Sequence, residues 1–124
     1  MQASMYERLG AAAGIKAIVA DVVEAHMNNP VIRARFLPYR DDPENLAAVS
    51  QQLCDFLCAG SGGPETYTGR DMVETHRGMN ISAEEYMAET DDIMATLAAH
   101  GIDEATRNDV LAIAYGLKGE IMRV

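Results

Sequence analysis

The sequence predicts an all-α protein. Apolar residues recur at intervals of three and four along most of the chain, and the ends of these stretches carry residues that begin or end helices. No stretch alternates apolar and polar residues in the manner of a β-strand. With 124 residues, of which 48% are hydrophobic, we expect one globular domain that spans residues 1–124.

The N-terminal part predicts two helices. Ser4-Met-Tyr-Glu7 is a capping-box pattern, so a short first helix should begin there and end near Gly10. A second helix is expected from about Gly14 to Asn28-Asn29-Pro30, because proline disfavours the helical conformation of the residue before it. The apolar face of this helix comprises Ile15, Ile18, Val19, Val22, Val23 and Met27.

A third long helix is predicted in the middle of the chain. It follows a short helical turn near residues 31–36 and a polar loop over residues 38–44. Asp42 followed by Pro43 indicates its start, because aspartate caps helices and proline suits the first helical position. Gly60-Ser-Gly-Gly-Pro64 indicates its end. Its apolar face comprises Leu46, Val49, Leu53, Phe56 and Leu57.

Two further helices are predicted after a weakly periodic segment. Residues 65–80 should form a loop with one or two helical turns that carry His76. Ser82-Ala-Glu-Glu85 is a second capping box, which opens a helix that ends at His100-Gly101. Asp103 caps the last helix. The apolar positions of these two helices are Tyr86, Ile93, Met94, Leu97, Val110, Ile113, Ala114, Leu117 and Ile121.

The charge balance excludes several classes of partner. Ten basic and nineteen acidic residues give a net charge of −9, and the basic residues form no dense cluster, so we expect no nucleic acid and no membrane partner. No apolar run approaches the roughly 20 residues that cross a bilayer. The N-terminus also lacks a basic segment followed by an apolar one, so a cytoplasmic location is the default expectation.

Only two cysteines occur, Cys54 and Cys58, four residues apart in a predicted helix. Two thiols alone make an incomplete metal site. We therefore expect reduced thiols packed in the core and no disulfide framework.

Three histidines limit the choice of metal ligands, and His76 is the strongest candidate. A neutral imidazole is a good axial ligand for haem iron, and His76 follows a glycine-rich break and is flanked by apolar residues. A surface or capping role is the alternative reading of His76. His26 extends the apolar face of the second helix, so it is expected in or beside the core, with haem coordination after a rearrangement as the alternative. His100 is expected to cap a helix end.

Motifs along the whole chain resemble the group I truncated haemoglobins. The run from Gly62 to Ile81 is the most specific part. The matching motifs, in the order and approximate spacing of the family, are Tyr6-Glu-Arg-Leu-Gly10, Phe36, Gly62-Gly-Pro64, Tyr67-Thr-Gly69, Met72 and His76-Arg-Gly-Met-Asn-Ile81. The resemblance implies a truncated globin, that is, a two-over-two helical sandwich with one non-covalently bound b-type haem per chain.

The resemblance also implies a set of site residues. His76 matches the proximal iron ligand of the family, and Phe36 matches the phenylalanine that packs on the porphyrin face. Arg70 and Arg77 flank the proximal segment and are the nearest candidates to pair with a haem propionate, and Arg77 is counted among the expected haem contacts. The other expected haem contacts are Val49, Leu53, Met72, Met79, Ile81, Tyr86 and Met94.

The distal side departs from the best-known members of the family. Val23 stands where the family often has a tyrosine that hydrogen-bonds dioxygen, and Val49 and Leu53 stand where glutamine or leucine is common. Loss of that hydrogen bond, worth roughly 1.5–3 kcal/mol, raises dioxygen release by one to two orders of magnitude. Gln52 is the one polar side chain near this face, with a solvent-exposed position as the alternative. The expected distal pocket comprises Val23, Val49, Gln52, Leu53 and Phe56.

The leading functional hypothesis is a haem protein that reversibly binds diatomic gases (O2, NO or CO), for oxygen binding or transport or for handling nitric oxide. Nitric oxide dioxygenation is its enzymatic version and implies an unidentified reductase partner. A monomer or weak homodimer is expected. One alternative is a haem electron-transfer or peroxidase-like protein, for which only His26 and Gln52 offer extra distal groups. Another is a haem-free, acidic helical interaction module.

Overall fold

The structure, a computed structural model, describes residues 3–124 and confirms the all-α prediction. Within that range there is no β-strand, only an isolated parallel bridge between Ile81 and Met122. The elements are α1 (Met5–Arg8), α2 (Ala11–Asn28), α3 (Arg33–Phe36), the 3₁₀-helix η1 (Leu37–Asp41), α4 (Pro43–Gly60), α5 (Met72–His76), α6 (Ala83–Ala99) and α7 (Glu104–Ile121).

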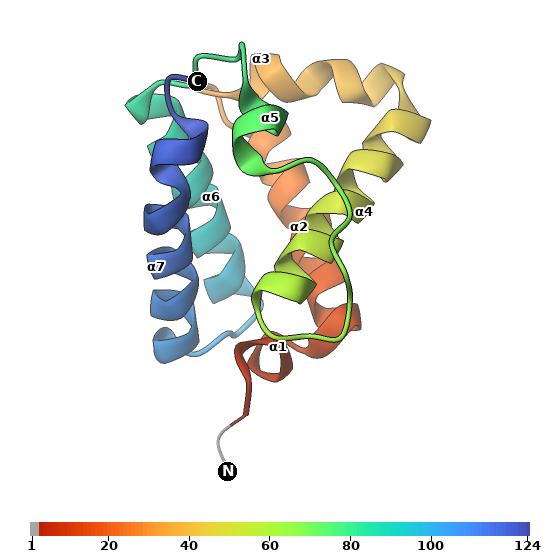
Figure 1. The fold of residues 1–124 in the computed structure, drawn as a ribbon, viewed down its shortest axis with the longest axis vertical. Coiled ribbons are helices and arrows are strands. Elements are labelled where there is room, and N and C mark those ends of the chain that lie inside the picture. Colours follow the sequence, from red (N-terminus) through yellow and green to blue (C-terminus); the bar gives the residue numbers. More distant parts are fainter. Residues whose placement is uncertain (1–2) are drawn as a thin grey trace.

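Four long helices form the framework. The helix α2 packs against both α4 and α6, and α6 packs against α7 (Figure 1). The loop after α4 returns along the molecule to the short helix α5, which packs on α7. The arrangement places α5 between the α6–α7 pair on one side and the α2–α4 pair on the other.

The hydrophobic core is centred on α2. Ile15 and Val19 are each only 1% exposed, and Leu97 of α6 is 2% exposed. Both cysteines are free and buried in this core, as predicted, and burial raises the pKa of each thiol. The buried members of the cluster are Leu9, Ile15, Ile18, Val19, Val22, Cys54, Cys58 and Leu97.

All four predicted side-chain caps are present. Ser4 and Ser82 form reciprocal capping boxes with Glu7 and Glu85. Asp42 accepts from the backbone N–H of Asn45 at the start of α4, and Asp103 accepts from that of Thr106 at the start of α7. These caps satisfy backbone donors that have no partner within the helix.

Two predicted boundaries were wrong. The helix α2 begins at Ala11 rather than near Gly14, because Gly10 takes a left-handed conformation (φ +96°) and serves as the N-cap. The expected polar loop after residue 37 is instead largely the 3₁₀-helix η1, which Pro38 opens and a hydrogen bond from Asp42 N–H to the Tyr39 carbonyl closes (3.2 Å).

Gly14 lies inside α2 and allows α1 to approach closely. A Cβ atom at this position would lie 2.4 Å from the carbonyl oxygen of Leu9, which is backbone and cannot easily move aside. We expect Gly14→Ala to lower the free energy of unfolding by about 1–3 kcal/mol, as measured by urea denaturation. The matched control is Gly116→Ala in α7, where the added methyl meets open space. This variant should be neutral or up to about 1 kcal/mol more stable, and an equal loss in both variants would contradict the prediction.

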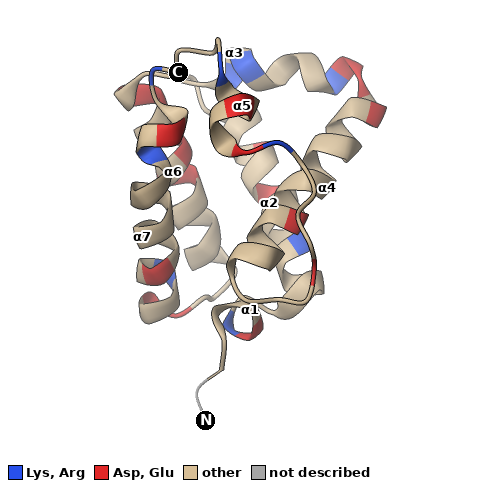
Figure 2. Cartoon of the chain, viewed as in Figure 1, with Lys and Arg blue, Asp and Glu red and all other residues tan. Residues whose placement is uncertain are grey.

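Basic residues are spread over several elements, as Figure 2 shows. Several of them pair with carboxylates from other parts of the chain: Arg8 with Asp109, Arg35 with Glu85 and Arg40 with Glu24. Among the described residues, no helix is both long and apolar enough to cross a membrane.

Candidate functional site

The candidate site begins with His76, the last residue of the short helix α5. Asp71 caps this helix by accepting from the backbone N–H of Glu74 (2.8 Å). The His76 side chain is half-buried, and its Nδ1 lies 2.8 Å from the carbonyl oxygen of Met72. A carbonyl only accepts hydrogen bonds, so Nδ1 carries the proton and Nε2 keeps a free lone pair. His76 is therefore oriented as a metal ligand that binds through Nε2.

Hydrogen bonds and close packing hold the loop before α5 against the N-terminal part of the molecule. The hydroxyl of Tyr6 donates to Glu65 (2.7 Å) and accepts from the backbone N–H of Ala12 (3.1 Å). Gly63 is packed so closely on the Tyr6 ring that a Cβ would lie 2.5 Å from it. The glycine-rich break thus lets the chain leave α4 beneath α1 and return toward α5.

The segment after α5 is fastened to the last residues of the chain. The backbone N–H groups of Gly78 and Asn80 donate to the carbonyl of Val124 (3.2 and 3.1 Å), and Arg123 N–H donates to the carbonyl of Ile81 (3.0 Å). The guanidinium of Arg77 is 66% exposed and pairs with Glu74. His76 therefore lies on a short helix that is held at both ends.

An apolar cleft separates α4 from α7. The predicted apolar face of α4 is only half-buried, as are Val110, Ile113 and Leu117 of α7. The cleft is lined by Met5, Leu9, Phe56, Leu57, Gly60, Ser61, Val110, Ile113 and Leu117. Opposed apolar faces that do not cover each other are typical of a ligand site, but of the predicted site residues only Phe56 lines this cleft.

A family model described as a bacterial-like globin matches residues 4–122. The chain belongs to the bacterial-like globin family. It is 28% identical over 110 residues to the group 1 truncated haemoglobin of Tetrahymena pyriformis, which covers 89% of this chain and 87% of the relative. It is 24% identical over 119 residues to that of Mycolicibacterium paratuberculosis, which covers 96% and 84%.

Solved structures confirm the fold of this globin. The Fe(III) truncated haemoglobin of Tetrahymena pyriformis superposes with a TM-score of 0.85 at 24% identity, over 98% of this chain and 100% of the other. The haemoglobin of Chloroflexus aurantiacus gives 0.80 at 23% identity, over 99% and 100%. The resemblance to truncated haemoglobins and the two-over-two architecture are thus confirmed, and the family implies haem-based gas binding.

The predicted haem contacts of this globin fall into two groups. Phe36, Val49, Leu53, Met72, Tyr86 and Met94 are half-buried, so they retain surface for a ligand. Ile81, by contrast, is only 3% exposed and forms the backbone bridge to Met122, while Met79 is 38% exposed. The hydroxyl of Tyr86 donates to the carbonyl of Ala114 (2.5 Å), which fixes this ring between α6 and α7.

The predicted distal residues also fall into two groups, half-buried and exposed. Val23 is half-buried and packs against the core. It lies on the same face of α2 as Ala12 and Lys16, which share a small pocket with residues of α4, so Val23 is turned toward α4. Val49, Leu53 and Phe56 are half-buried on α4, but Gln52 is exposed. The inward position considered for Gln52 is therefore absent from this structure.

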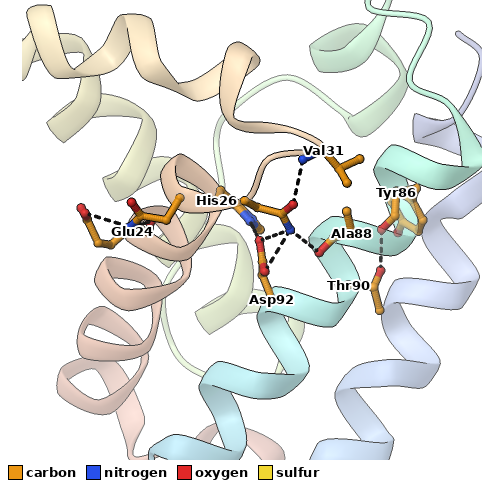
Figure 3. A network of polar contacts seen from close by, with 9 residues as sticks. Glu24, His26, Val31, Tyr86, Ala88, Thr90 and Asp92 are labelled. Atoms are coloured by element: carbon orange, nitrogen blue, oxygen red, sulfur yellow. Dashed lines mark hydrogen bonds and ion pairs between the residues drawn. The ribbon is translucent and has the colours of Figure 1, made fainter.

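The other two histidines are engaged elsewhere. His26 is 5% exposed, and its Nδ1 lies 2.8 Å from Asp92, which also accepts from the side-chain amide of Asn29 (Figure 3). Burial lowers the pKa of His26, and the Asp92 carboxylate opposes this shift. The His26 ring also lies 4.9 Å from that of Phe36. His100 does end α6, and its Nε2 lies 2.7 Å from Asp21 of α2.

Sequence reasoning missed one half-buried acid, Glu89 of α6. Burial, together with the carboxylates of Glu85 and Asp92, raises its pKa to about 7. Its spacing could have indicated this position. Glu89 stands three residues after Tyr86 and four before Ile93, on the apolar face of the helix.

Proposed function

We propose that this globin binds one b-type haem per chain, with His76 as the iron ligand, and that it reversibly binds a diatomic gas. The family supports haem-based gas binding. The observation that carries the role of His76 is its Nδ1–H donation to the Met72 carbonyl, which leaves Nε2 for the metal. The haem iron would supply the coordination position at which the gas binds.

The surrounding residues support this assignment by their exposure and polarity. Half-buried apolar side chains on α4, α6 and α7 would cover the macrocycle, with Phe36 on one face and Met79 at an edge. The exposed guanidinium of Arg77 would exchange its contact with Glu74 for a propionate. The full set of proposed contacts is Phe36, Val49, Leu53, Met72, Arg77, Met79, Ile81, Tyr86 and Met94.

The walls near the gas would be largely apolar, since Val23, Val49, Leu53 and Phe56 offer no strong donor and Gln52 is exposed. Such a pocket favours ready release of the gas, as in transport or nitric oxide handling, over tight storage. We place this activity in a single domain of residues 1–124, in the cytoplasm, in a monomer or weak homodimer. Any redox turnover would need a reductase that is not identified.

Absorption spectra test the proposal directly. We expect the haem-reconstituted protein to show a Soret band and, when reduced without gas, a five-coordinate ferrous spectrum, because the distal valines and leucine have no lone pair for the sixth position. Carbon monoxide should then shift the band. Absence of any haem spectrum would favour the acidic interaction module. A six-coordinate ferrous spectrum that disappears in His26→Ala would favour electron transfer.

A further inference from the structure

Glu89 is half-buried, and its position on α6 lies on the side of the helix that faces the space between α2 and α7. On one side of it, Ala88 and Asp92 face α2, where the side-chain amide of Asn29 donates to both (3.5 and 3.1 Å). On the other side, Tyr86 bonds to the carbonyl of Ala114 in α7. Successive residues of an α-helix are turned by about 100° around its axis. Glu89 therefore lies about midway between the side of α6 that faces α2, with Ala88 and Asp92, and the side that faces α7, with Tyr86. Figure 3 shows the two flanking sides of α6.

Glu89 has no polar partner within residues 3–124. It makes no hydrogen bond or ion pair there, because the nearby Arg35 binds Glu85 and the carbonyl of Met79 instead. The hydrogen bond from Arg35 lowers the pKa of Glu85 to about 2. At neutral pH Glu85 is therefore ionised, whereas Glu89, one turn further along α6, is near the midpoint of its titration.

Burial and the charged groups around Glu89 account for its raised pKa. Burial makes the largest contribution and raises the pKa of Glu89, the carboxylates of Glu85 and Asp92 from α6 raise it further, and only Arg35 from α3 lowers it. His26 from α2 is already bound to Asp92. The phenol of Tyr86 is adjacent, since its own pKa is raised by burial and by the charge of Glu89. On the α7 side, the Ala114 carbonyl accepts the hydrogen bond of the Tyr86 hydroxyl.

Among the predicted distal residues there is no inward-facing donor, since Val23, Val49 and Leu53 are apolar and Gln52 is exposed. We propose that Glu89 is the polar group of the gas-binding pocket: its protonated carboxyl donates a hydrogen bond to the gas, and its ionisation removes that donor and makes gas release depend on pH. This inference rests on the proposed haem function. A protonated carboxyl has one O–H donor, whereas a carboxylate only accepts.

The first test measures dioxygen dissociation from the haem-loaded protein by stopped flow, between about pH 6 and pH 8. In the wild type, the rate should rise about three- to tenfold with a midpoint near the pKa of about 7. Glu89→Gln should give a slow rate at every pH, because its amide always donates. Glu89→Leu should give a fast rate at every pH. The control Glu84→Gln, at an exposed position of the same helix, should keep the wild-type profile.

The second test needs no haem. A buried acid with a raised pKa binds more protons in the folded state, so the stability of the haem-free protein should fall as the pH rises from about 4.5 to about 7. Urea unfolding should show this fall in the wild type and in Glu84→Gln, and a smaller one in Glu89→Gln.

The outcomes of these tests distinguish the proposed role of Glu89 from the proposed haem function. If the protein binds haem and gas but dissociation is independent of pH, or if the pH dependence persists in Glu89→Gln, the role of Glu89 is wrong and the haem function stands. If haem does not bind at all, both are wrong. A stability effect of Glu89 without an effect on gas release would show that it is buried away from the gas, and would also overturn the inference.

Discussion

His76→Gly is expected to purify without haem, or to hold it only when imidazole is added to the buffer. The variant removes the Nε2 lone pair that the Met72 carbonyl leaves free, while the loop and the caps of α5 stay in place. Loss of a group that only orients a metal ligand typically costs 10–100-fold in affinity, so loss of the ligand should cost more than about 100-fold. Haem titration followed by Soret absorbance measures this loss.

His100→Gln is the matched control for His76→Gly. His100 lies at the end of α6 and contacts Asp21 of α2, so its replacement disturbs a polar contact between α6 and α2 and leaves α5 unchanged. Haem affinity in this variant should equal that of the wild type. If His76→Gly also kept an unchanged affinity and an unchanged ferrous spectrum, the iron ligand would be another residue.

Helix starts could be predicted because the interactions that make them are local. Each side-chain cap joins residues three apart, so Ser4, Asp42, Ser82 and Asp103 are recognisable from their immediate neighbours. The start of α2 could not be predicted in this way. Gly14 resembles a helix breaker in the sequence, but its role is to let the Leu9 carbonyl approach, which depends on how α1 lies against α2.

The site was predictable to different degrees. His76 was recognisable as a candidate iron ligand because it stands in a specific run of glycines and apolar residues within a chain that has three histidines. Glu89 was not, because α6 carries several other acids, such as Glu84 and Asp91, which are exposed. An isolated glutamate in such a helix normally faces solvent, and only the rotation of α6 relative to α2 and α7 turns this one inward.

The state of Gln52 shows a further limit of sequence reasoning. Helical spacing places it beside Val49 and Phe56, at the border of the apolar face of α4, where a small rotation decides between pocket and solvent. The structure has the side chain exposed. The donor that the sequence suggested on α4 is thus replaced by a carboxyl on α6, four residues after the Arg35-bound Glu85.

Val23→Tyr is expected to slow dioxygen dissociation by about 10–100-fold. Val23 is half-buried and turned toward α4, so a tyrosine there would bring a phenolic O–H to the apolar side of the pocket. A hydrogen bond of roughly 1.5–3 kcal/mol corresponds to one to two powers of ten in rate. Stopped-flow measurement at a pH below about 6 keeps Glu89 protonated, so that only the new donor changes.

Val23→Phe separates the hydroxyl from the added bulk, because it has the same ring without a donor. If the hydroxyl is responsible, Val23→Phe should leave dissociation within a few-fold of the wild type, and equal slowing in both variants would assign the effect to steric trapping.

Gln52→Ala should accelerate release only severalfold, since that side chain is exposed. A hundredfold acceleration would instead mean that Gln52 turns inward when gas is bound and governs its release. The pocket would then hold its ligand firmly enough to make nitric oxide dioxygenation the better description of this globin.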